Sequence, residues 1–174
     1  MVVYTTPSKA IFQTGCIPQR YLDEKVDAKR AIDVFNEEIA KTDIVYLNSS
    51  AYLENYKNEE WPIFYNTGIY WSRPAEQLIS QKITELIAES YSVPVKTIQL
   101  TELQKQTIPY WRDADVYDLL NIWCGKMDTE YYQFSIEANV PETYANYNVL
   151  LQGGSFGKGL KKDFLEKILP KYSE

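Results

Sequence analysis

The residues whose types and spacing suit chemistry best are glycines and a lysine near the carboxyl end of the chain. Residues 153–159 read Gly-Gly-Ser-Phe-Gly-Lys-Gly, between an expected strand and an expected helix. Backbone N–H groups at a helix start can hold a phosphate, and a lysine adds a counter-charge. A Walker A loop has a different spacing, so a flexible connection is favoured over a coenzyme site. The candidate phosphate-binding residues are Gly153, Gly154, Gly157, Lys158 and Gly159.

Two groups of carboxylates form further candidates. Asp113, Asp115 and Asp118 resemble a set that could hold Mg²⁺, but they begin an expected helix, where acidic side chains serve as N-cap and first-turn residues. Three glutamates within residues 54–60 lie among aromatic side chains. A glycosidase pairs carboxylates in this way, and a solvated loop has the same composition. We therefore expect neither a metal nor a cofactor.

Histidine is absent from all 174 residues. Its absence excludes a Ser-His-Asp triad, a Cys-His pair and a histidine-ligated zinc within this chain. General acid–base chemistry near neutral pH would need a tyrosine, or a carboxylate or lysine whose pKa is shifted by its surroundings.

The cysteines and the apolar runs point to the reducing interior of a cell. Cys16 and Cys124 cannot form a four-thiolate zinc site and are expected to be free thiols. No apolar run approaches the length needed to span a bilayer, and no segment has the pattern of a signal peptide. We expect a cytoplasmic protein without membrane contacts.

Charge and aromatic content favour a protein partner. The net charge is -6, and residues 97–157 hold three basic side chains against eight acidic ones. We therefore expect no direct nucleic-acid binding, because it needs clustered positive charge, whereas a basic protein partner fits the acidic balance. The chain also has 15 tyrosines and 4 tryptophans, residue types that are enriched at interfaces. The expected contacts are Tyr52, Tyr56, Trp61, Tyr65, Tyr110 and Trp111, with Asp113 and Asp115 on the rim.

Apolar periodicity predicts the elements. Strands are expected at residues 2–4, 44–47, 95–100, 130–140 and 147–151, a hairpin at 63–71, and helices at 23–40, 72–87, 116–123 and 160–169. Polar and apolar residues alternate throughout 130–140, which is typical of a half-buried antiparallel strand. The pattern predicts one α+β domain over residues 1–174, with a mixed or mainly antiparallel sheet and three to four helices mostly on one face.

These observations favour a non-enzymatic intracellular protein-binding module, such as an inhibitor or immunity-type factor, that uses an acidic surface rich in Tyr and Trp. One alternative is a small transferase or hydrolase that binds a phosphate-bearing ligand at residues 153–159. A second alternative is a structural subunit of a homo-oligomeric assembly.

Overall fold

The computed structural model describes residues 1–23, 29–110, 112–120, 128 and 130–168. The chain divides into two compact units, residues 1–58 and 59–174. Each unit combines helices with a small two-stranded sheet, one parallel and one antiparallel, which confirms the expected α+β class. The expectation of a single domain stays a prediction.

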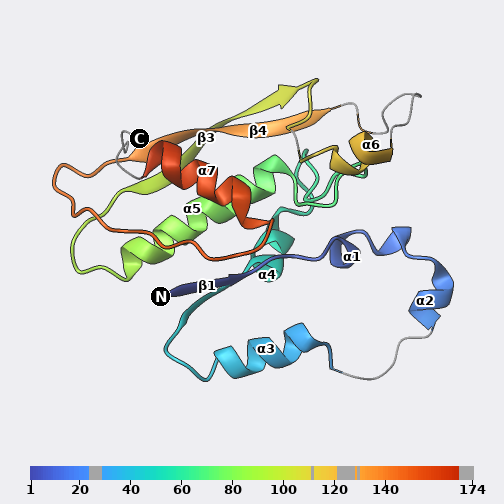
Figure 1. Cartoon of the computed structure of the whole chain (residues 1–174), viewed down its shortest axis with the longest axis horizontal. Helices are drawn as coiled ribbons and strands as arrows, with labels where there is room; N and C mark the ends of the chain where they lie inside the picture. Colours follow the sequence, from blue (N-terminus) through green and yellow to red (C-terminus); the bar gives the residue numbers. More distant parts are fainter. Residues whose placement is uncertain (24–28, 111, 121–127, 129, 169–174) are drawn as a thin grey trace. The chain divides into compact units, whose positions relative to one another are not determined.

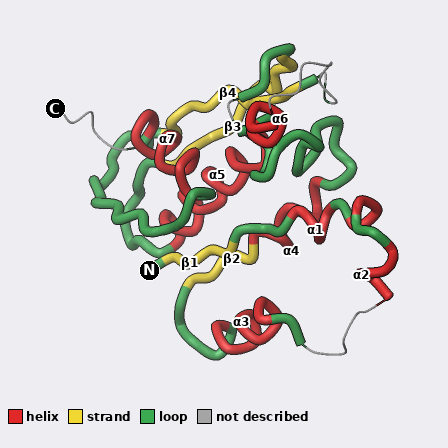
Figure 2. The backbone as a smooth tube through the Cα atoms, turned by 45° about the vertical axis from the view of Figure 1, so that its right-hand side comes forward, coloured by secondary structure: helices red, strands yellow, loops and turns green. Residues whose placement is uncertain are grey.

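The 1–58 unit is built on two short parallel strands. β1 (Val2–Thr5) pairs with β2 (Val45–Asn48), in the register Val2↔Val45 (Figure 2). The Tyr46 hydroxyl donates to Asn36 Oδ1 at 2.6 Å and is hydrogen-bonded to Thr5 Oγ1, which ties the sheet to a helix. The helical elements are α1 (Lys9–Phe12), η1 (Thr14–Cys16), α2 (Gln19–Asp23), α3 (Ala31–Ile39), α4 (Ser49–Leu53) and η2 (Glu54–Tyr56).

The 59–174 unit is a β-ribbon with two helices on one side. β3 (Thr97–Gln106) and β4 (Tyr131–Asn139) are antiparallel, with a register shift between Leu100 and Leu103. α5 (Arg73–Glu89) and α7 (Gly157–Lys167) lie side by side and contact both strands (Figure 1). The short helix α6 (Asp115–Leu120) lies in the connection between the strands.

Part of the core of this unit comes from the apolar helical stripes that the sequence predicts. Ile79 and Ile83 of α5 are buried, as are Leu160 and Phe164 of α7. Ser72 caps α5 through its hydroxyl, which accepts from the Ala75 amide, and Pro74 lies in its first turn. Each buried aliphatic side chain contributes about 1.5–3 kcal/mol to the free energy of unfolding.

A polar stripe on α5 binds the backbone of the ribbon. The Gln77 side chain accepts from the Phe134 amide and donates to the Phe134 carbonyl, both at 2.7 Å. One turn along the helix, Gln81 Oε1 accepts from the Leu100 amide. Backbone groups of both strands therefore have a hydrogen-bond partner on the helix. Backbone N–H and C=O groups that are removed from water need such partners.

Some expected elements differ in the structure. Residues 63–71 form a loop instead of a hairpin, and residues 147–151 contain no strand, with Leu150 93% exposed. The expected helix at 116–123 begins at Asp115 and is described to Leu120. Part of the expected 23–40 helix is confirmed as α3, and residues 24–28 lie outside the described residues.

Cys16 is exposed and is not in a disulfide, and Cys124 lies outside the described residues. Among the helices of the described ranges, none is long and apolar enough to cross a bilayer.

Replacing Gln77 by Met removes both bonds to Phe134 while keeping the length of the side chain. We expect a loss of about 2 kcal/mol or more in the free energy of unfolding, measured by urea denaturation, because two backbone groups lose their partner. The same change at exposed Gln99 of β3 is the control and should stay within about 0.5 kcal/mol. Equal losses for the two variants would contradict a specific role for Gln77.

Candidate functional site

A loop of residues 65–72 holds α6 in place. The Thr67 carbonyl accepts from the amides of Val116 and Tyr117, at 3.0 and 3.3 Å. The Ile69 amide donates to Asp115 Oδ1 at 2.9 Å. The first turn of α6 is therefore fixed to this loop by three hydrogen bonds.

Gly68 allows the loop to approach the chain before α6. A Cβ atom at this position would lie 3.0 Å from the carbonyl oxygens of both Arg112 and Asp113. The sequence Asn66-Thr67-Gly68, which predicts a hairpin turn, forms the seat of a helix instead.

α6 carries exposed apolar side chains beside acidic ones. Leu119 is 79% exposed, Leu120 is 62% exposed, and Ile69 of the supporting loop is 52% exposed. Asp118 is exposed and Asp115 is half-buried. We call Ile69, Asp115, Asp118, Leu119 and Leu120 the α6 surface.

Behind α6 lies a buried cluster of four charged side chains. Arg73 of α5 forms a two-pronged pair with Asp163 of α7, at 2.5 and 3.2 Å, and contacts Glu76 at 3.1 Å. Arg112 contacts the other oxygen of Glu76 at 3.3 Å. All four side chains are at most 5% exposed. We call Arg73, Glu76, Arg112 and Asp163 the ion cluster.

Neutral groups complete the ion cluster. The Trp71 indole N–H donates to Glu76, and the Ser80 hydroxyl lies 2.8 Å from Asp163 Oδ2. The Tyr110 ring lies under the Arg73 guanidinium, and the Tyr70 ring lies under that of Arg112. Such cation–π contacts add to the attraction when water is excluded.

Burial shifts the protonation equilibria within the cluster. Burial raises the pKa of Glu76, although Arg73 and Arg112 oppose this. Burial works to lower the pKa of Arg73, but the carboxylates of Asp163 and Glu76 raise it above its ordinary value. The charges of Glu76 and Arg73 therefore depend on their partners.

Asp113 is a fifth ionisable group beside the cluster. It is 1% exposed, and its Oδ1 accepts from the Arg73 amide at 3.1 Å. Oδ2 is buried without a hydrogen-bond partner. Burial, with a contribution from the Glu76 charge, raises the pKa of Asp113 to about 8. At 1% exposure, the side chain of this acid is sealed from solvent by the described residues around it.

Gly159 of α7 lies directly against Glu76. A Cβ atom at position 159 would lie 1.8 Å from Glu76 Oε2. This glycine is therefore explained by the close approach of a buried carboxylate, a role that the sequence alone does not distinguish from phosphate binding.

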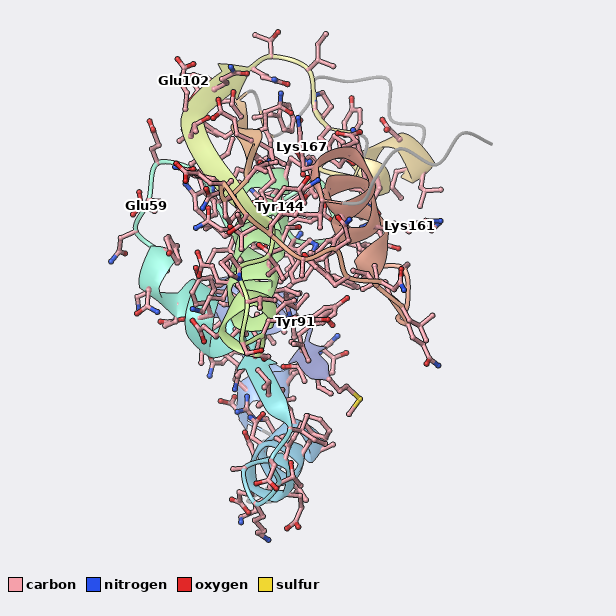
Figure 3. All side chains as sticks on the ribbon, turned by 90° about the vertical axis from the view of Figure 1, so that its left-hand side faces the viewer. Glu59, Tyr91, Glu102, Tyr144, Lys161 and Lys167 are labelled. Carbon is pink, nitrogen blue, oxygen red and sulfur yellow. The ribbon has the colours of Figure 1, made fainter. Side chains whose placement is uncertain are left out.

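Several backbone groups of the 153–159 loop are also bonded within the protein. The Gly157 amide donates to the Gly154 carbonyl and the Lys158 amide to the Ser155 carbonyl. Arg112 donates to that same Ser155 carbonyl. Gly153 and Lys158 are exposed, and Lys161 projects outward from α7 one turn later (Figure 3). Two amides that a phosphate would use are thus already bonded.

Three of the expected partner contacts are buried, which corrects their placement on the surface. Trp61 packs its ring edge-on against Phe134, and the Tyr65 hydroxyl accepts from the Tyr132 amide. Asp113 lies beside the ion cluster. The ring of Trp61 and the polar groups of Tyr65 and Asp113 therefore make contacts inside the 59–174 unit.

Four of the remaining expected contacts are half-buried. Tyr52 and Tyr56 pair through their hydroxyl groups at 3.3 Å in the 1–58 unit. Tyr110 stacks on Arg73, and Asp115 belongs to the α6 surface. Trp111 lies outside the described residues. The exposed leucines of α6 were missed because their spacing predicts a buried helical stripe.

Comparison with known protein families, with curated proteins and with solved structures gives no match to this chain.

Replacing Gly159 by Ala tests the contact with Glu76. Helix propensity alone predicts a gain of about 1 kcal/mol, because alanine is the better helix former. The clash with Glu76 predicts a loss of about 3 kcal/mol instead. Urea unfolding separates the two, with Gly154→Ala as the control, since a Cβ atom there meets nothing within 4 Å. A stabilised Gly159→Ala protein would contradict the packing assigned here.

Proposed function

We propose that this chain is a non-enzymatic, intracellular protein-binding module, of an inhibitor or immunity type, whose partner docks on the α6 surface. The observation that carries the proposal is the exposure of Leu119 and Leu120 on a helix whose backbone is fixed by hydrogen bonds. A preorganised apolar contact loses little conformational entropy on binding. Two adjacent leucines exposed beyond 60% also form an apolar feature of the kind that marks interaction sites.

The charges around the α6 surface favour a basic partner. Asp115 and Asp118 precede the leucines on α6, and Asp128 lies beside the supporting loop, since it accepts from the Thr67 amide. Of the described basic side chains within residues 97–157, Arg112 is buried in the ion cluster and Lys105 pairs with Glu130. Complementary charge speeds association and sets orientation, while the buried apolar centre supplies most of the affinity.

A photo-crosslinking residue at position 119 tests the proposal. We expect it to capture one protein species from the source cells, and the same residue at position 142 to capture none of that species. Glu142 is exposed and follows β4 at its far end, so it is a matched surface control. Equal capture from both positions, or none from position 119, would contradict the docking site.

The charge argument is tested with the captured protein once purified. Asp118→Lys is expected to slow association several-fold at low salt, because it reverses a charge on the rim. Glu142→Lys changes the net charge equally and should leave the rate nearly unchanged. Leu119→Ala should weaken binding about tenfold through faster dissociation. If both lysine variants slow association alike, the partner responds to net charge and not to the α6 surface.

A further inference from the structure

Asp113 connects the ion cluster to the α6 surface. It comes two residues before α6, and its backbone carbonyl accepts from Thr67 Oγ1 at 3.1 Å. Its side chain accepts from the Arg73 amide at the first residue of α5. Any movement of α6 away from its seat at residues 65–72 therefore pulls on the segment that contains Asp113.

The charges that face Asp113 are balanced without it. The ion cluster contains two guanidinium groups and two carboxylates. An ionised Asp113 would add an uncompensated negative charge where water is excluded, and one of its oxygens has no donor. The ionisable groups facing it are Arg73 and Glu76 from α5, Tyr65 from the loop, Tyr131 from β4 and, through Arg73, Asp163 from α7.

We propose that α6 separates from residues 65–72 with release of the proton held by Asp113. Acid then favours the closed state, in which α6 is bound to this loop, and alkali favours the open state, in which it is not. In the closed state the carboxyl group is neutral and sealed. In the open state it reaches water, loses its proton to solvent and becomes an ordinary carboxylate. The biological meaning of this opening rests on the proposed function, because partner binding needs the α6 surface closed and preorganised. The opening itself does not depend on that function.

The direction and size of the pH dependence follow from the linkage between proton binding at Asp113 and the opening equilibrium. The pKa of Asp113 is about 8 in the closed state and has its ordinary value of 3.8 once the group is exposed. Between about pH 5 and pH 7 the closed state therefore binds one more proton than the open state. The equilibrium constant for opening should rise about tenfold per pH unit in this window and level off above about pH 8.

Hydrogen exchange of the whole chain measures this opening without any partner. The reporters are the amides of Ile69, Val116 and Tyr117, which hold α6 to its loop. After correction for the intrinsic exchange rate, their protection should fall about a hundredfold from pH 5 to pH 7. They should also exchange faster at every pH than the Ile98 amide, which is bonded to buried Thr84.

Asp113→Asn is the decisive variant, because asparagine copies the shape of the neutral acid and cannot ionise. Its reporter amides should keep the same protection at pH 5 and pH 7, whereas Asp118→Asn, on exposed α6, should retain the hundredfold fall. Flat protection in the unmodified chain overturns the proposal, whether or not the variant folds. Exchange of the reporters and of Ile98 at equal rates also overturns it, because opening would then be global unfolding. Failure to capture a partner at position 119 would refute the proposed function and leave this opening intact.

Discussion

The 59–174 unit depends on burying opposite charges together. Removing one ion from water costs several kcal/mol, so Arg73 and Asp163 can be buried only if nearly every polar atom is matched. Asp163 accepts two bonds from Arg73 and lies beside the Ser80 hydroxyl, and Glu76 receives bonds from both arginines and from Trp71. Both oxygens of each carboxylate are therefore bonded, and removing one member leaves the others buried without compensation.

This requirement also fixes how α5 and α7 pack. Gly159 and Asp163 are four residues apart, so they lie on the same face of α7, and Arg73 and Glu76 are neighbours one turn apart on α5. Only one sliding position of the helices brings Gly159 against Glu76 while Asp163 meets Arg73. Apolar stripes alone tolerate small shifts of one element against another. The hydrogen bonds from α5 to the ribbon also restrict shifts of α5 along the strands.

The sequence predicts the elements that are set by local patterns. Ile79 and Ile83 recur at helical spacing in α5, and the alternation along β4 predicts its strand correctly. What it misses are polar residues with buried partners far along the chain. Gln77 and Asp163 have the composition of a solvated face, and only the Phe134 backbone and Arg73 explain their burial. Tyr131 of β4 is 1% exposed because it packs on Tyr65, another long-range contact.

A chain without histidine has no side chain whose ordinary pKa lies near neutrality. Burial of Asp113 creates such a group, since it brings the pKa of a carboxyl to about 8. Because the group is 1% exposed, its proton leaves only when the surrounding structure opens. In a catalytic acid the same shift would serve proton transfer to a substrate, which requires contact with that substrate. In a sealed acid the shift is coupled to packing, so the free energy of proton release acts on the position of α6 and on the leucines that it presents.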